Sequence, residues 1–349
     1  QNARAACALP SAHRLALTGT PIENRLLVLW SIFQFARPGV LVHRAGFVKN
    51  FDRKDDIFAR RRLAARTRPF LLRRTKSEVA SDLPERVEED IIVEMEGTQA
   101  KLYQAELKRA RAQLLKAETD KQLDKLRFNI LTSLLRLRQI CCHPRLLGLD
   151  ESAVNSKSKK KSKKTSSAPK PASQDAPEAD STKLSALLDL LEPLMEEGQK
   201  VVVFSQVLQL HDLAGEALAA RDWKSFRLDG STDDRGPLVQ DFQTHEGPAV
   251  FLISLKAGGS GLNLTAAAYV VLFDPWWNPA VEAQAIDRTH RIGQKQTVFA
   301  YRLLVIDSIE EKIRRLQKQK GALAKDILGE ENFARALTLE DFQFLLGGE

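Results

Sequence analysis

The sequence Phe251-Leu-Ile-Ser-Leu-Lys-Ala-Gly-Gly-Ser-Gly-Leu-Asn-Leu264 decides the fold, together with the segment that continues it to Arg302. Short apolar runs alternate here with a glycine-rich turn, an aromatic loop and an arginine-rich helix. Continuous apolar strands between helices are typical of a parallel sheet covered on both faces. Such sheets bind ligands at the carboxyl ends of their strands. The polar segments that follow the apolar runs therefore form the candidate site.

The same alternation surrounds this stretch, so we expect an α/β fold over residues 183–325. Strands are expected at 201–204, 225–228, 250–254, 269–274 and 298–304, and helices at 183–195, 207–220, 234–243, 281–289 and 309–319. Towards the N-terminus the pattern is mainly helical. There we expect helices at 26–35, over most of 56–80 and over 99–140, the last of these broken near 119–120. Strands are expected at 13–17 and 87–95, and a helical tail over 326–349.

Residues 149–182 differ in composition, since Lys, Ser, Ala and Pro dominate. Such a segment buries too little apolar surface to fold, so a disordered linker is predicted. Its basic run at 157–164 either contacts phosphates nonspecifically or is merely solvated.

The net charge of +8 and the pI near 9.3 favour a polyanionic partner, although a solvated basic surface explains them equally well. Cys7, Cys141 and Cys142 show no metal-binding spacing, so we expect no metal ligands and a reduced, intracellular setting. No apolar run approaches the length of a membrane span. The first residue is Gln1, in what looks like the middle of a strand and turn, so the chain is expected to be part of a longer protein.

Gln284, Arg288 and Arg291 are spaced i, i+4, i+7, which predicts that one helical face carries all three. Two guanidinium groups without an acidic residue between them suit phosphate oxygens, and an arginine can stabilise the charge of a phosphoryl group in transfer. Asn278 and Pro279 are expected to begin this helix. The alternative is an exposed basic helix.

Glycines after the strand at 250–254 permit positive φ and close approach of the backbone to a ligand. Gly259 and Gly261 are candidates for that contact, Asn263 for a hydrogen bond across the site, and Lys256 for a phosphate contact. Trp276 and Trp277 lie in a loop, where adjacent aromatic residues are not expected to face one core. One of them is expected to pack and the other, Trp277, to meet a nucleic acid. Burial of both is the alternative.

The sequence has no Gly-Lys pair, so a phosphate-binding loop of the G-x-x-x-x-G-K-[ST] type is absent. No Asp-Glu pair follows an apolar strand to hold Mg²⁺. We therefore expect the chain alone to be inactive, with the groups that bind the β- and γ-phosphates lying upstream of it.

The ordered motifs resemble the Swi/Snf-type family of helicase-related DNA translocases over nearly the whole chain except the linker. The double tryptophan is similar to bacterial HepA-like members. The matching segments are Leu17-Thr18-Gly19-Thr20-Pro21-Ile22-Glu23-Asn24 (third helicase motif), Phe70-Leu71-Leu72-Arg73-Arg74, Leu83-Pro84, Tyr103 and Cys142-His143-Pro144 (connecting segment), Val203-Phe204-Ser205-Gln206 (fourth motif), Leu228-Asp229-Gly230-Ser231-Thr232, the glycine-rich turn (fifth), the arginine helix (sixth) and Ser308-Ile309-Glu310-Glu311-Lys312-Ile313 (closing helix).

The resemblance implies an ATP- and Mg²⁺-dependent motor on double-stranded DNA that remodels chromatin or another nucleoprotein, with RNA polymerase among its possible partners. It divides the chain into the end of a first RecA-like lobe (1–24), a helical region (25–148), the linker (149–182), a second RecA-like lobe (183–325) and the tail (326–349). It places the motor in the bacterial nucleoid, or in the nucleus of a eukaryote. Residue by residue it implies arginine fingers (Arg288, Arg291), nucleotide contacts (Gln284, Asp287, Gly259, Gly261, Asn263), DNA contacts (Ser205, Lys256, Trp277) and coupling residues (Thr18, Gly19, Thr20).

Two other functions remain open at this stage. A non-catalytic DNA-binding or docking module is favoured by the missing phosphate-binding loop, and is opposed by two arginines suited to a triphosphate. A strand-separating helicase is disfavoured by the double-tryptophan loop and the helical insertions.

Overall fold

The computed structural model describes residues 2–17, 26–51, 57–72, 74, 76–80, 82–115, 120–148, 181–255, 261–319 and 337–347. The chain forms two compact units, Gln1–Ser81 with Ala322–Phe333, and Asp82–Gly321 with Ala334–Glu349. No helix in the described ranges is both long and apolar enough to cross a membrane.

The first unit is helical in its described part. Leu29 and Phe33 of one helix pack with Phe47, Phe51 and Leu63 of two others, which gives this unit its own apolar core. The strand expected at 13–17 is wrong, because those residues adopt no regular structure and pair with no described strand. The elements are α1 (Asn2–Ala8), α2 (Leu26–Ala36), α3 (Arg44–Phe51), α4 (Ile57–Thr67), the 3₁₀ turn η1 (Arg68–Phe70) and α5 (Lys76–Val79).

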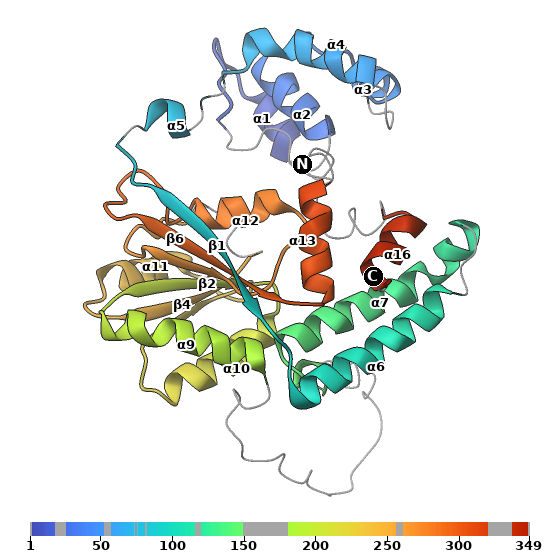
Figure 1. The fold of residues 1–349 in the computed structure, drawn as a ribbon. Helices are drawn as coiled ribbons and strands as arrows, with labels where there is room; N and C mark the ends of the chain where they lie inside the picture. The colour runs from blue at the N-terminus through green and yellow to red at the C-terminus, as the bar shows by residue number, and fades with distance from the viewer. Residues whose placement is uncertain are drawn as a thin grey trace, which may run out of the picture. The chain divides into compact units, whose positions relative to one another are not determined.

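The second unit is built on a parallel sheet of six strands in the order β1-β6-β5-β2-β4-β3, which confirms the predicted α/β fold (Figure 1). The strands are β1 (Arg86–Val93), β2 (Lys200–Ser205), β3 (Ser225–Leu228), β4 (Ala249–Ser254), β5 (Tyr269–Leu272) and β6 (Val298–Val305). The helices are α6 (Gly97–Leu114), α7 (Asp120–Cys142), α9 (Thr182–Glu196), α10 (Leu208–Ala219), α11 (Arg235–Thr244), α12 (Pro279–Ile286), α13 (Ile309–Gln319) and α16 (Leu339–Leu346).

Helices cover both faces of this sheet, as the continuous apolar strands predict. Successive strand residues point to opposite faces, so Val201 and Val203 pack with α9 and α10, while Val202 and Phe204 pack with α11 and α12. The two resulting cores hold β2, β4 and β5 in the middle of the sheet. Their carboxyl ends carry the candidate site.

β1 belongs to the sheet and not to the helical region in which it was expected. It pairs in parallel with β6, from Arg86 opposite Val298 to Val93 opposite Val305. Consequently residues 82–148 share a compact unit with the rest of the sheet, and the border expected at 148 does not separate compact units.

α6 and α7 lie side by side and form a helical hairpin attached to the sheet (Figure 1). The Gln99 amide of α6 joins α7 to α9, since it donates to the carbonyl of Ile140 at 2.6 Å and accepts from the Thr182 backbone at 3.1 Å. Ser181 caps α9, so this helix begins inside the predicted linker. The remainder of that linker, residues 149–180, lies outside the described residues.

Candidate functional site

Helix α12 is shorter than its sequence pattern predicts. Asn278 caps it as expected, accepting a hydrogen bond from the Ala280 backbone at 2.9 Å, but the helix ends at Ile286. The prediction that Gln284, Arg288 and Arg291 share one helical face is therefore wrong. Gln284 is half-buried on α12, and both arginines lie in the turns that follow it.

Gln294, for which the sequence predicts no role, holds these turns in place. Its side-chain amide donates to the carbonyls of Ala267, Thr265 and Thr289 at 2.9, 3.2 and 3.3 Å. Gly293 allows the turn with a φ of +103°. The glutamine therefore ties the turns after α12 to the segment that precedes β5. In the sequence, Gln294 is marked only by its position directly after Gly293, which follows the segment from Arg288 to Arg291.

The structure brings the arginine turn together with the segment that follows the glycine-rich turn. Arg291 Nη1 lies 3.5 Å from the Gly261 carbonyl, and the Leu264 backbone donates to the Arg288 carbonyl at 3.0 Å. Gly261 has a φ of +45°, which agrees with the positive φ predicted for this turn. Asn263 is exposed beside it, and its carbonyl accepts from Gln243 at 3.0 Å.

The two arginines form a cationic pair. Burial lowers the pKa of Arg288, and the charge of Arg291 lowers it further. Arg288 is 7% exposed and Arg291 is exposed, and no carboxylate in the described ranges forms an ion pair with either. A buried guanidinium next to a second one lacks counter-charge, which an anionic ligand would supply.

Asp287 lies next to this pair but is engaged elsewhere. Its carboxylate accepts from Arg86 on β1 at 3.3 Å and its side chain is 41% exposed. This ion pair links the first turn after α12 to the edge strand.

Ser205 ends β2 and is fully buried, so a direct DNA contact by its hydroxyl does not fit the structure. The hydroxyl donates to Asp274 Oδ1 at 2.6 Å, and the same oxygen accepts from the Gln206 backbone at 3.0 Å. Asp274 thus joins the loops that follow β2 and β5. No role was predicted for Asp274 from the sequence.

Both tryptophans of the aromatic loop are buried, each 5% exposed, which corrects the expectation that Trp277 faces outward. They reach different environments. Trp276 packs in the core beside α12, and the Trp277 ring lies 5.7 Å below the Arg138 guanidinium of α7. The contact of Trp277 with Arg138 joins segments far apart in the chain, which the local sequence does not reveal.

Five predicted positions lie outside the described residues: Thr18, Gly19, Thr20, Lys256 and Gly259. Across the ranges that the structure describes, no group of three or more His, Cys, Asp and Glu side chains is placed to hold a metal ion.

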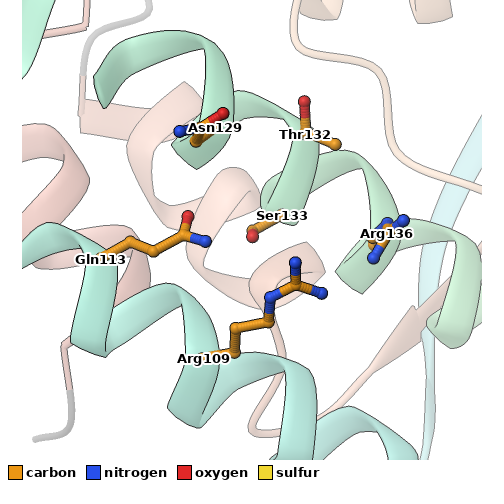
Figure 2. Close-up of a pocket in the computed structure, with 6 residues that line it drawn as sticks. All are labelled: Arg109, Gln113, Asn129, Thr132, Ser133 and Arg136. Atoms are coloured by element: carbon orange, nitrogen blue, oxygen red, sulfur yellow. The ribbon is translucent and has the colours of Figure 1, made fainter. Parts of the chain in front are cut away.

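A polar cavity of about 220 Å³ opens between α6 and α7 (Figure 2). Arg109 and Gln113 of α6 and Arg136 of α7 line it, and Arg109 also pairs with Glu106 at 3.7 Å. None of the residues predicted to contact nucleotide or DNA lines this cavity. Arg136 lines this cavity, whereas Arg138 of the same helix contacts the aromatic loop.

Two family models match the chain in sequence. The SNF2-related domain matches residues 1–146, and the helicase conserved C-terminal domain matches residues 182–293. The unmatched residues between them contain most of the predicted linker.

Among curated proteins, an uncharacterized ATP-dependent helicase of Mycoplasma pneumoniae is 38% identical over 330 residues, covering 94% of this chain and 29% of the relative. The putative ATP-dependent helicase/translocase YwqA of Bacillus subtilis is 36% identical over 356 residues, covering 99% of this chain and 36% of the relative. The chain thus spans about a third of the length of these relatives.

Among solved structures, the Sulfolobus solfataricus SWI2/SNF2 ATPase core in complex with dsDNA has a TM-score of 0.57 and 29% identity, covering 98% of this chain and 68% of that one. The C-terminal part of the Fun30 ATPase domain has a TM-score of 0.57 and 26% identity, covering 76% and 96%. These neighbours confirm that the six-stranded sheet is a RecA-like α/β fold.

Proposed function

We propose, from the premise that this chain belongs to the SNF2-related family of ATP-dependent helicase-like ATPases, that it is the arginine-bearing part of a double-stranded DNA translocase. The parent protein would bind ATP on a first RecA-like lobe and close that lobe onto the sheet described above. The motor would remodel a nucleoprotein, such as chromatin or a complex with RNA polymerase.

The observation that carries this proposal is the cationic pair of Arg288 and Arg291. It lies in the turns after α12, beside Gly261, and no described carboxylate neutralises it. An exposed basic helix, the alternative reading, would not bury Arg288 to 7% exposure or hold its turn with three hydrogen bonds from Gln294. A phosphate group is the anion that suits two fixed guanidinium groups.

ATP with Mg²⁺ would supply the phosphoryl-transfer chemistry. Arg288 and Arg291 would bind phosphate oxygens, and Arg291 would stabilise the charge that develops on them. Gln284, Asp287, Gly259, Gly261 and Asn263 would line the same region, and the segment of Thr18, Gly19 and Thr20 would couple hydrolysis to closure. Lacking a phosphate-binding loop, the chain alone would not hydrolyse ATP.

DNA contacts are proposed for the loops at the carboxyl ends of β2, β4 and β5. Lys256 and the loop that carries Trp277 would follow the phosphate backbone. Ser205 would act indirectly, because its hydroxyl is committed to Asp274. The net charge of +8 and the DNA-bound relative from Sulfolobus support a DNA partner.

The test of the cationic pair replaces Arg291 by Ala in the parent protein and measures DNA-stimulated ATP hydrolysis. Loss of one such donor should lower kcat by about 100- to 1000-fold, while DNA binding in the absence of ATP changes little. Arg315→Ala is the matched control, since Arg315 is an exposed arginine of α13 paired with Glu311. Unchanged hydrolysis in Arg291→Ala removes Arg291 from the mechanism.

A second assay separates translocation from strand separation. The parent should displace a third strand from a triplex when supplied with ATP, and should leave a blunt duplex intact. Release of single strands from the blunt duplex would identify a helicase instead. A parent that binds DNA but has no ATPase activity would be the docking module.

A further inference from the structure

Arg138 reaches from the helical hairpin into the carboxyl edge of the sheet. Its Nη2 donates to the Asp274 carboxylate at 3.3 Å and to the Pro275 carbonyl at 3.0 Å, and its guanidinium lies over the Trp277 ring. The side chains of Arg138 and Asp274 are 5% and 1% exposed. One side chain of α7 therefore contacts Asp274, Pro275 and Trp277 of the aromatic loop.

Asp274 extends this contact to the neighbouring strand. Its other oxygen, Oδ1, accepts from the Ser205 hydroxyl and the Gln206 backbone. β2 and β5 are adjacent in the sheet, and Ser205 and Asp274 follow at their carboxyl ends. The Arg138–Asp274 pair thus lies where two loops of the ligand-binding edge meet.

The aromatic loop continues directly into the arginine site. The Trp276 backbone donates to Glu282 of α12 at 2.8 Å, and Asn278 caps the same helix. α12 then ends in the turns that carry Arg288 and Arg291. A continuous series of contacts runs from α7 through the loop and α12 to the cationic pair, entirely within the second unit.

Burial of this ion pair indicates a role in geometry. Removing an arginine and a carboxylate from water is costly, and apolar residues of similar volume often stabilise a core equally well. A guanidinium that contacts a carboxylate, a carbonyl and an aromatic face fixes both the position and the orientation of the loop that carries them. Apolar packing does not do this.

We propose that Arg138 is a positioning residue that fixes the loop from Asp274 to Trp277 to the helical hairpin and thereby sets the cationic pair for catalysis. This inference rests on the proposed ATPase function. Arg138 touches neither nucleotide nor DNA in it. Its effect reaches the reaction through Asp274 and α12.

The activity test compares Arg138→Met with Arg136→Met in the parent protein. Arg136 lies on the same helix but lines the polar cavity between α6 and α7 (Figure 2). Misplacement of catalytic groups by about 1 Å costs up to roughly 100-fold in rate. Arg138→Met should therefore lower kcat at saturating DNA by about 10- to 100-fold, with the KM for ATP nearly unchanged, and Arg136→Met should keep the parental kcat.

Arg138→Lys is the rescue variant. The hydrogen bonds to Asp274 and Pro275 both come from Nη2, so an ammonium group can make them, and this variant should recover part of the rate that Arg138→Met loses. Parental kcat in Arg138→Met, or an equal loss in Arg136→Met, overturns the proposal. So does a loss of thermal stability without a loss of kcat.

A spectroscopic measurement decides the loop contact independently of ATP hydrolysis. Arg138→Met should change the tryptophan emission of the folded protein, and the change should vanish in a Trp277→Phe background. An unchanged emission spectrum overturns the contact. If Arg138→Met does not fold, Arg138→Gln replaces it in both measurements, and Arg138→Lys stays the rescue variant. A parent without ATPase activity disproves the proposed function, and the emission change then reports on the Arg138 contact alone.

Discussion

Lys183 and Glu310 form an ion pair whose two side chains are both fully buried. The Lys183 ammonium donates to the Glu310 oxygens at 2.8 and 2.6 Å, and the ring centre of Phe273 lies 5.3 Å away. Burial opposes the charge of Lys183, but the adjacent carboxylate outweighs it and raises the lysine pKa. The pair joins the first turn of α9 to the first turn of α13, and the residues of the candidate site lie between these two helices in the sequence.

Breaking this pair from one side should be severe. Glu310→Gln leaves a buried ammonium without counter-charge, which costs about 3–5 kcal/mol of unfolding free energy. The double change Lys183→Met with Glu310→Leu should cost much less, because no charge remains buried. Urea denaturation followed by circular dichroism measures both. A double variant as unstable as the single one would show that packing, and not charge, dominates here.

Tyr103 supplies a second prediction, since its hydroxyl accepts a hydrogen bond from the Ile309 backbone at the start of α13 at 2.7 Å. Tyr103→Phe leaves that buried N–H unsatisfied and should destabilise the second unit by about 1–3 kcal/mol. Tyr301→Phe is the control, because Tyr301 is half-buried and stacks on Phe299. Equal melting temperatures for Tyr103→Phe and the parent would contradict the prediction.

The attachment of β1 should weaken in acid. Burial alone would raise the pKa of Glu88 and Asp90, but hydrogen bonds from Arg86 to Glu88 and from Arg302 to both outweigh it and lower both pKa values. A carboxylate whose pKa is lower in the folded state stabilises the fold fully above its unfolded pKa, which is 4.5 for Glu88 and 3.8 for Asp90. This contribution is lost as the pH falls through the pKa of the folded state.

Denaturation at pH 7 and at steps below pH 4.5 tests this expectation. The double variant Glu88→Gln with Asp90→Asn should be less stable than the parent at pH 7 and should lose less stability on acidification. Glu89→Gln, on the opposite side of the same strand, should follow the parental profile. A double variant with the parental acid dependence would assign the acid sensitivity to other carboxylates.

Gln294 gives a prediction for the arginine turn. Gln294→Ala removes the donor to three backbone carbonyls and should cost about 1–3 kcal/mol, most of it local to the turn. In the parent, kcat should fall because Arg288 and Arg291 lose their fixed position, while ATP affinity changes little. Gln296→Ala, an exposed neighbour, is the control. Parental kcat in Gln294→Ala would show that the turn is held by other contacts.

The periodicity of apolar residues was enough to place most helices and strands of the sheet. The strand predicted at 225–228 is β3, the helix predicted at 309–319 is α13, and the two helices predicted over 99–140 are α6 and α7. These elements depend on the side-chain period of each element and on short-range capping, and both are readable along the chain. The ordered motifs pointed to the family in the same way, because their order and spacing are properties of the sequence.

Contacts between distant segments decided the rest. β1 joins β6 more than 200 residues away, and Arg138 meets Asp274 at a separation of 136 residues. The turn after α12 is tied to the carbonyls of 265 and 267 that Gln294 reaches, and the Trp277 ring meets the Arg138 guanidinium of α7. Local pattern determined which residues are helical, extended or apolar. Only the tertiary structure determined which polar groups meet, because a hydrogen bond or ion pair between remote segments leaves no periodic trace in either of them.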